Sequence, residues 1–148
     1  MDQGPNPKST AAIAGHPLHP MLIPFPVAFF VTTLVTDIAY VKTANPLWAT
    51  ASTWLVGAGV VMGLVAALAG FTDFFGSGQI RALKAVWRHM IGNLLAVTIS
   101  AVNFWVHYQH GSSSLFLTLS AVVVLILLYT GWMGWEMVYR HRVGVADN

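Results

Sequence analysis

Four long apolar runs, separated by short polar breaks, constrain the fold of this chain more than any other feature. They cover about residues 21–41, 47–71, 87–105 and 115–139. A helix needs ~20 mostly apolar residues to cross a membrane. Unpaired strand edges are not tolerated against lipid, so each run is predicted to be a membrane-spanning helix. We therefore expect an all-α integral membrane four-helix bundle, with its N- and C-termini on the same side and its surface in contact with the lipid bilayer.

The composition agrees with a chain surrounded by lipid. Hydrophobic residues make up 56% of the 148 residues and charged residues only 8%, whereas a soluble domain carries about a quarter charged residues. The length predicts one four-helix domain, residues 21–139, between a polar His-Pro segment, 1–20, and a short tail, 140–148. The first ten residues lack the basic start of a signal peptide, so the first span is expected to be retained.

Several classes of function are excluded or disfavoured. The chain has no cysteine, which excludes disulfides, thiolate metal sites and thiol nucleophiles. A net charge of +2 without a basic stripe argues against nucleic-acid binding. No nucleophile elbow, phosphate-binding loop or zincin spacing indicates hydrolytic catalysis, and the sequence leaves open whether the protein is an enzyme.

The lysine and arginine residues predict the orientation. Six of the seven fall on the side of the two termini, and they are Lys8, Arg81, Lys84, Arg88, Arg140 and Arg142. Only Lys42 falls on the opposite side. Positive charge is retained in the cytoplasm, so we expect a multi-pass protein of the bacterial inner (plasma) membrane with both termini cytoplasmic.

The sequence GHPLHPM, residues 15–21, is the sharpest local motif. Proline disfavours helical geometry in the residue before it, so His16 and His19 are expected to be extended. In polyproline II the repeat of three residues would aim both rings the same way. The two imidazoles could then share a metal, or one could bind it while the other supports the site. The alternative is that the motif only stiffens the approach to the first helix.

The third apolar run carries a polar stripe. Its members, His89, Asn93, Ala96, Ser100, Asn103 and His107, are spaced by four and three residues. This is the spacing of a helix face that points toward neighbouring helices. We expect His89 to belong to a site, and Asn93 is a candidate to support it. For Asn93, Ser100 and Asn103, however, interhelical hydrogen bonds are the favoured interpretation.

Three charged side chains have local interpretations. Asp73 either orients a histidine that binds a ligand or pairs with Arg81 or Arg88. Glu136 and Arg140 are four residues apart in the favourable order, and we expect an intrahelical ion pair.

Asp37 lies near the opposite end of the bundle, about one turn before Lys42. A carboxylate in a membrane segment is costly without a partner. We expect it to contact Asn103 or His107, with water or Lys42 as the competing partners. The sequence does not tell whether His107 and His110 form a second site.

Small residues are expected to let helix backbones approach each other in lipid. The second run carries Gly59, Gly63, Ala66, Ala67 and Gly70, and the fourth carries Gly131 and Gly134. We interpret both sets as packing seams inside the bundle. A homodimer contact is the alternative.

The chain resembles a family of bacterial four-helix predicted membrane proteins of unknown function. The resemblance rests on GHPLHPM, on Asp73 in FTDFF, on His89 with Asn93, and on a last helix that ends in GWMGWEMVYRHRVGV. It covers roughly Gly15 to Val145, although the family has Gly where this chain has Arg142. Some relatives are fused to Rieske-type iron–sulfur domains, which implies electron transfer near the membrane.

These features lead to three hypotheses. The first is a b-type haem protein that exchanges electrons with a quinone or a redox protein, since four-helix bundles hold haem through inward histidines. The second is a non-haem site for Zn, Fe or Cu. The third is a cofactor-free structural or assembly subunit. For the haem, the expected ligands are His89 with one of His16, His19 and His141, while Arg81 and Arg88 would neutralise the propionates. For a non-haem metal the expected ligands are His16, His19, His89 and His141, with Asp73 as a further candidate.

Overall fold

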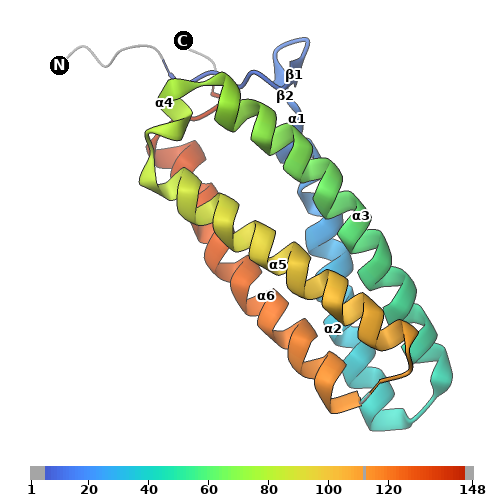
Figure 1. The fold of residues 1–148 in the computed structure, drawn as a ribbon. Helices are drawn as coiled ribbons and strands as arrows, with labels where there is room; N and C mark the ends of the chain where they lie inside the picture. Colours follow the sequence, from blue (N-terminus) through green and yellow to red (C-terminus); the bar gives the residue numbers. More distant parts are fainter. Residues whose placement is uncertain (1–5, 112, 146–148) are drawn as a thin grey trace.

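The computed structural model describes residues 6–111 and 113–145. Residues 1–5 of the expected His-Pro segment and 146–148 of the expected tail lie outside the described residues. The described chain is almost entirely helical and forms an elongated bundle (Figure 1). Four of its helices are long and apolar enough to cross a membrane. The predicted all-α membrane bundle is therefore confirmed.

Each spanning helix contains one of the apolar runs and continues past it. The elements are α1 (Leu18–Leu22), α2 (Pro24–Thr43), α3 (Pro46–Gly76), α4 (Gly78–Arg81), α5 (Lys84–Tyr108), α6 (Ser113–Trp135) and a π-helical turn, η1 (Glu136–Arg140). The first span is α1 followed by α2, and the fourth is α6 followed by η1. Asn45 caps α3 by accepting a hydrogen bond from the backbone N–H of Leu47, and Pro46 occupies the first helical position, where its missing N–H costs nothing.

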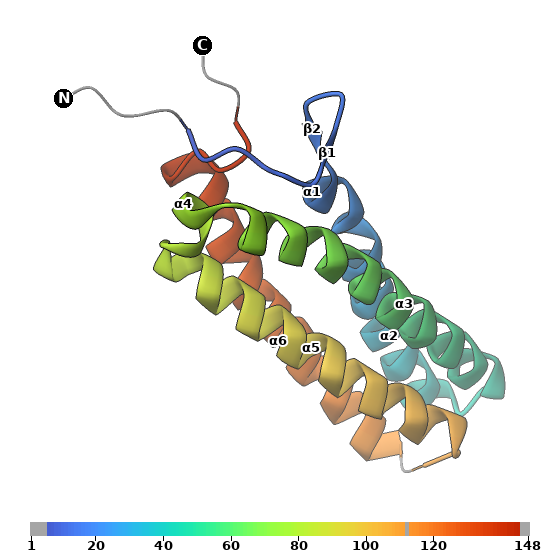
Figure 2. The ribbon, with the colours of Figure 1, turned by 45° about the horizontal axis from the view of Figure 1, so that its top comes forward.

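The four helices pack as two antiparallel pairs, α2 with α3 and α5 with α6, which also contact each other (Figures 1 and 2). The centre of the bundle takes one buried side chain from each helix, Phe30, Val56, Ala96 and Val123. A Cβ at Gly59 would meet the Phe30 ring at 2.5 Å. The glycine therefore lets the large ring fill the space between α2 and α3, and the expected packing seam of α3 is present here.

The two ends of the described chain meet at one end of the bundle. Gly144 donates its backbone N–H to Pro7 O at 2.8 Å, and Asn6 Nδ2 donates to Val145 O at 3.2 Å. We call this end the termini end. The opposite end, where one loop joins α2 to α3 and another joins α5 to α6, is the loop end (Figure 1).

The GHPLHPM motif provides the second strand of a hairpin and the short helix that follows it. Strands β1 (Ala12–Ile13) and β2 (His16–Pro17) pair antiparallel around a two-residue turn. Ala14 and Gly15 have φ values of 50° and 81°, as a tight hairpin turn requires at both central positions.

The expectation that both histidines are extended is wrong for His19, which lies inside α1. Pro20 is only the third residue of α1, in the first turn, where a proline removes no hydrogen bond that the helix would otherwise make. His16 lies in strand β2, so the two histidines belong to different elements, and their Nδ1 atoms have different partners, Ala14 O for His16 and Ala66 O for His19.

Candidate functional site

His19 of α1 and His89 of α5 meet inside the termini end of the bundle. Their ring centroids lie 6.0 Å apart, and the ring planes are nearly perpendicular, at 82°. The two residues are 70 positions apart in the chain, so the contact depends on how α1 packs into the bundle. The expected site around His89 therefore acquires one specific partner, His19, from the three that the sequence offered.

Both imidazoles are held in the same way, by a main-chain carbonyl on a neighbouring helix. His19 Nδ1 lies 2.8 Å from Ala66 O of α3, and His89 Nδ1 lies 2.8 Å from Thr130 O of α6. A carbonyl oxygen only accepts, so each Nδ1 carries the proton and donates it. In the neutral ring this leaves the lone pair of Nε2 available, which is the usual second-shell arrangement of a histidine that binds a metal.

Two glycines make room for the two rings. A Cβ at Gly70 would lie 3.1 Å from Cε1 and Nδ1 of His19. A Cβ at Gly134 would lie 3.3 Å from Cε1 of His89. The small residues expected to form seams in the second and fourth spans therefore act here as spaces for imidazoles. Gly131 differs, because nothing lies within 4 Å of its added Cβ.

The two histidines line a cavity of about 190 Å³ in the termini half of the bundle. Its walls are mostly apolar and include Phe30, Phe74 and Met90. Among the lining residues, Val27, Leu64 and Leu94 are exposed. The cavity therefore opens between the helices toward the surface that lipid covers.

Asn93, four residues after His89 on α5, connects α5 to α6. Its side-chain Nδ2 donates to His89 O at 2.8 Å, and its Oδ1 accepts from the Thr130 hydroxyl at 3.1 Å. Asn93 thus forms the expected interhelical hydrogen bond, and it fixes the same residue whose carbonyl holds the His89 ring. Ser100 does not, since its hydroxyl donates to Ala96 O within α5.

His16 and His141 are not brought to this cavity. His16 is exposed, and its Nδ1 bonds to Ala14 O within the hairpin. His141 is half-buried after η1, where its backbone N–H donates to Glu136 O. Within residues 6–111 and 113–145, no three His, Asp or Glu side chains gather as a group that could hold a metal.

Arg81 and Arg88 also lie away from the two imidazoles. Both are exposed, and neither lines the cavity. Arg88 instead stands at a shallow groove between α5 and α6, with Gly92 and Tyr129.

Asp73 holds the N-terminal segment across the termini end. Its Oδ1 accepts from Ser9 Oγ at 2.8 Å and from the backbone N–H groups of Thr10 and Ala11 at 2.7 and 2.8 Å. The Thr10 hydroxyl adds a bond to Thr72 O at 2.8 Å. Neither of the partners expected for Asp73, a histidine or an arginine, is among these contacts. No periodicity in the sequence connects residues more than sixty positions apart, so the sequence carried no signal for this clamp.

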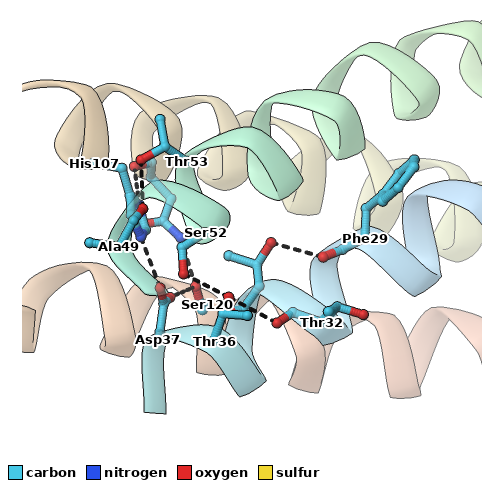
Figure 3. Close-up of polar contacts among 11 residues, drawn as sticks. Phe29, Thr32, Thr36, Asp37, Ala49, Ser52, Thr53, His107 and Ser120 are labelled. Carbon is cyan, nitrogen blue, oxygen red and sulfur yellow. Dashed lines mark hydrogen bonds and ion pairs between the residues drawn. The ribbon is translucent and has the colours of Figure 1, made fainter. Parts of the chain in front are cut away.

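A second polar cluster lies near the loop end (Figure 3). His107 Nε2 and Asp37 Oδ1 are 2.9 Å apart, so the predicted contact between these spans is confirmed. Ser120 Oγ of α6 donates to Asp37 Oδ2 at 2.6 Å and accepts from Asn103 Nδ2 at 2.8 Å. Thr36 and Ser52 hydrogen-bond to each other alongside, at 2.7 Å. The sequence did not predict that Ser120 would join Asp37 to Asn103, because serine is too common in such helices for one of them to be singled out.

The ion pair on the last helix is also as predicted. Arg140 Nη1 lies 3.1 Å from Glu136 Oε1, four residues away. The pair is partly exposed and belongs to the surface of the termini end, apart from the two imidazoles.

Comparison with known proteins identifies the family of this chain. A family model described as a predicted membrane protein (DUF2231) matches residues 15–147. No curated protein and no solved structure matches the chain.

Proposed function

The chain belongs to the DUF2231 family of predicted membrane proteins, and from this starting point we propose that it is a b-type haem protein for electron transfer, whose haem would be held by the imidazoles of His19 and His89. The observation that carries the proposal is the pair of imidazoles facing one cavity, each with its Nδ1–H committed to a carbonyl. Two imidazoles would be sufficient to hold a haem, without a third protein group.

The separation of the rings fits two imidazoles on one metal. Two imidazoles that would each bind the same metal through a bond of about 2 Å would have their ring centroids roughly 6 Å apart. The observed distance is 6.0 Å. The cavity of about 190 Å³ is smaller than a porphyrin, so the macrocycle would extend past the exposed side chains at the rim, such as Leu64 and Leu94.

The surroundings favour haem over a bare metal ion. Zinc sites in proteins usually have three or four protein ligands. Asp73 also lines this cavity, but in the described chain no third histidine or carboxylate gathers with the two imidazoles into a group that could hold a metal. The walls are largely apolar, as suits a flat hydrophobic macrocycle. Haem, when bound, would supply an iron that can take up and release one electron. The chain would hold it through the two imidazoles, which the carbonyls of Ala66 and Thr130 orient. The opening toward lipid favours a quinone as the electron partner, and a redox protein is the alternative.

The distribution of Lys and Arg residues suggests on which side of the membrane the two imidazoles lie. Six of seven Lys and Arg residues belong to the termini end or its flanking segments, which favours the cytoplasmic side of a bacterial inner membrane. The two imidazoles would then lie near the cytoplasmic surface. Arg81 and Arg88 remain candidates for the propionates only if their exposed side chains reach around the helix ends.

Absorption spectroscopy of the purified protein tests the proposal. The protein should be produced with ample haem and examined for a Soret band and for the sharp α and β bands of reduced six-coordinate haem. His19→Ala and His89→Ala should each remove most of the haem while the protein stays in the membrane. His16→Ala and His110→Ala are matched controls, because both histidines are exposed and lie outside the cavity. Both control variants should retain the haem.

Other results would replace the proposal. Stoichiometric Zn, Fe or Cu without porphyrin would establish the non-haem alternative. A wild-type protein that takes up neither haem nor metal, even when titrated with haem in lipid, would favour the structural or assembly role. Equal loss of haem in His16→Ala and His89→Ala would contradict the choice of His19.

A further inference from the structure

The polar cluster near the loop end contains two titratable groups that the haem proposal does not use. Asp37 of α2 is 0% exposed and His107 of α5 is 5% exposed. Both lie within spanning helices, where an ionisable side chain is costly and commonly marks an ion or proton path.

The hydrogen bonds fix how many protons the pair holds. His107 Nδ1 lies 2.9 Å from Asn103 O, and a carbonyl only accepts, so Nδ1 carries a proton. The 2.9 Å contact between His107 Nε2 and Asp37 Oδ1 requires one more. That proton sits either on the imidazole, opposite a carboxylate, or on the carboxyl group, opposite a neutral ring. In both cases the pair is neutral overall and holds one proton between two bases.

The cluster continues from this pair to an acceptor that lacks a partner. The Ser120 hydroxyl gives its proton to Asp37 Oδ2, so its oxygen needs a donor, and Asn103 Nδ2 supplies it. This fixes the amide orientation and leaves Asn103 Oδ1 without a hydrogen-bond partner among the described residues. Asn103 is 1% exposed, and leaving a buried acceptor unsatisfied is destabilising. A water molecule is the small donor that fits this need.

We propose that Asp37 and His107 form a proton-binding site that exchanges one proton, through water at Asn103, with the aqueous phase at the loop end. Release of the proton to water leaves Asp37 as a carboxylate and His107 as a neutral ring with its proton on Nδ1. Uptake restores the shared proton. The route to water is short, because His107 is one residue from the end of α5 at Tyr108.

The side chains that contact this pair in the described chain carry no further acid or base that could hold the proton. The helix of Asp37, α2, contributes the hydroxyl of Thr36. The other helices packed around the pair contribute the hydroxyls of Ser52 on α3 and Ser120 on α6 and the ring of Phe116 on α6. The Phe116 ring stacks on His107 with centroids 4.3 Å apart. Further ionisable side chains at this end are the half-buried Tyr40 and the exposed Lys42, Tyr108 and His110. In the described chain, the sole ion-pair partner of Asp37 is His107.

Spectroscopy of both partners in the same sample tests the proposal. Protein labelled with ¹⁵N-histidine and ¹³C-aspartate is placed in lipid nanodiscs, and the ring nitrogens and carboxyl bands are followed as pH is changed. We expect the signals of His107 and Asp37 to change together in the step that removes the shared proton, because the protons of two coupled groups belong to the pair and not to either residue. Asp37→Asn keeps the shape but replaces one carboxylate oxygen by an NH2 group and cannot ionise, so this joint step should vanish and at most a change at His107 alone should remain. His110→Asn, in the nearby loop, should leave it unchanged.

Wild-type protein alone gives a second measure in case Asp37→Asn fails to fold. Transfer to D₂O should shift the protonated band of the pair faster than it exchanges the backbone N–H groups of the central turns of α5. The proposal is overturned if neither group changes with pH while the protein stays folded, or if the step survives in Asp37→Asn. Sodium-dependent changes without pH dependence would also overturn it, in favour of a cation site. None of these outcomes depends on haem binding.

Discussion

The imidazole of His107 lies 2.9 Å from the carboxyl group of Asp37, across 70 positions of the chain. Both side chains are buried in the bundle, so each is the main compensation for placing the other in lipid. His19 and His89 are also 70 positions apart and meet at the other end of the bundle. In both cases an α5 histidine near one end of the helix is paired with a residue of the first span.

The first prediction concerns stability. Asp37→Ala leaves His107 Nε2 and the Ser120 hydroxyl without their buried partner, and removing one member of a buried pair costs about 3 kcal/mol or more. Lys42→Ala, at the exposed end of the same helix, should change the free energy of unfolding by less than about 0.5 kcal/mol. Reversible unfolding in bicelles measures both. Adding His107→Ala to Asp37→Ala should restore part of the loss, and simple additivity of the two losses would show that the pair is not coupled.

The second prediction concerns the space around His19. Gly70→Ala places a Cβ 3.1 Å from the ring, which would displace Nδ1 from Ala66 O. Disturbing the group that orients a ligand lowers affinity about 10–100-fold, so haem titration should show weaker binding of this order. Gly78→Ala is the control, because nothing lies within 4 Å of its added Cβ and Gly78 does not line the cavity. Equal affinities for the two variants would argue that the position of His19 is irrelevant to binding.

The third prediction concerns the N-terminal clamp. Asp73→Ala removes the acceptor of two backbone N–H groups, those of Thr10 and Ala11. Hydrogen bonds to a charged group contribute about 1.5–3 kcal/mol, so hydrogen exchange of these two amides should accelerate at least about 10-fold. Mass spectrometry of the N-terminal peptides measures this, with the α6 peptides as internal reference. Asp73→Asn keeps one acceptor oxygen and should give an intermediate rate; protection as in the wild type in Asp73→Ala would rule out the clamp.

The fourth prediction concerns orientation in the membrane. A reporter fused after Asn148 should be active in the cytoplasm, and one inserted in the loop between His110 and Ser114 should be active outside. The reason is the distribution of cations, with only Lys42 at the loop end. Paired reporters, one active on each side of the membrane, check each position. The opposite pattern at both positions would reverse the compartments in the proposals above.

The candidate site was partly predictable because part of it is encoded by local spacing. The four-and-three spacing along α5 correctly placed Asn93, Asn103 and His107 on the face that meets other helices. The outcome differed for Ser100, because a serine in lipid also satisfies its hydroxyl on the carbonyl four residues before it. For His19 the rule for residues before proline was outweighed by the position of Pro20 in the first turn of a helix, where the proline ring meets no helical carbonyl four residues earlier and its missing N–H breaks no hydrogen bond.

The sequence by itself determined the class of this protein. Span length, composition, cation distribution and the polar stripe on α5 are local properties that depend on each helix alone. Only the tertiary structure decided that His19 rather than His16 meets His89, that Asp73 holds residues 9–11, and that Ser120 completes the cluster at Asp37. Those contacts depend on the rotation and crossing of helices from distant parts of the chain, which close packing between whole helix faces sets and no single segment encodes.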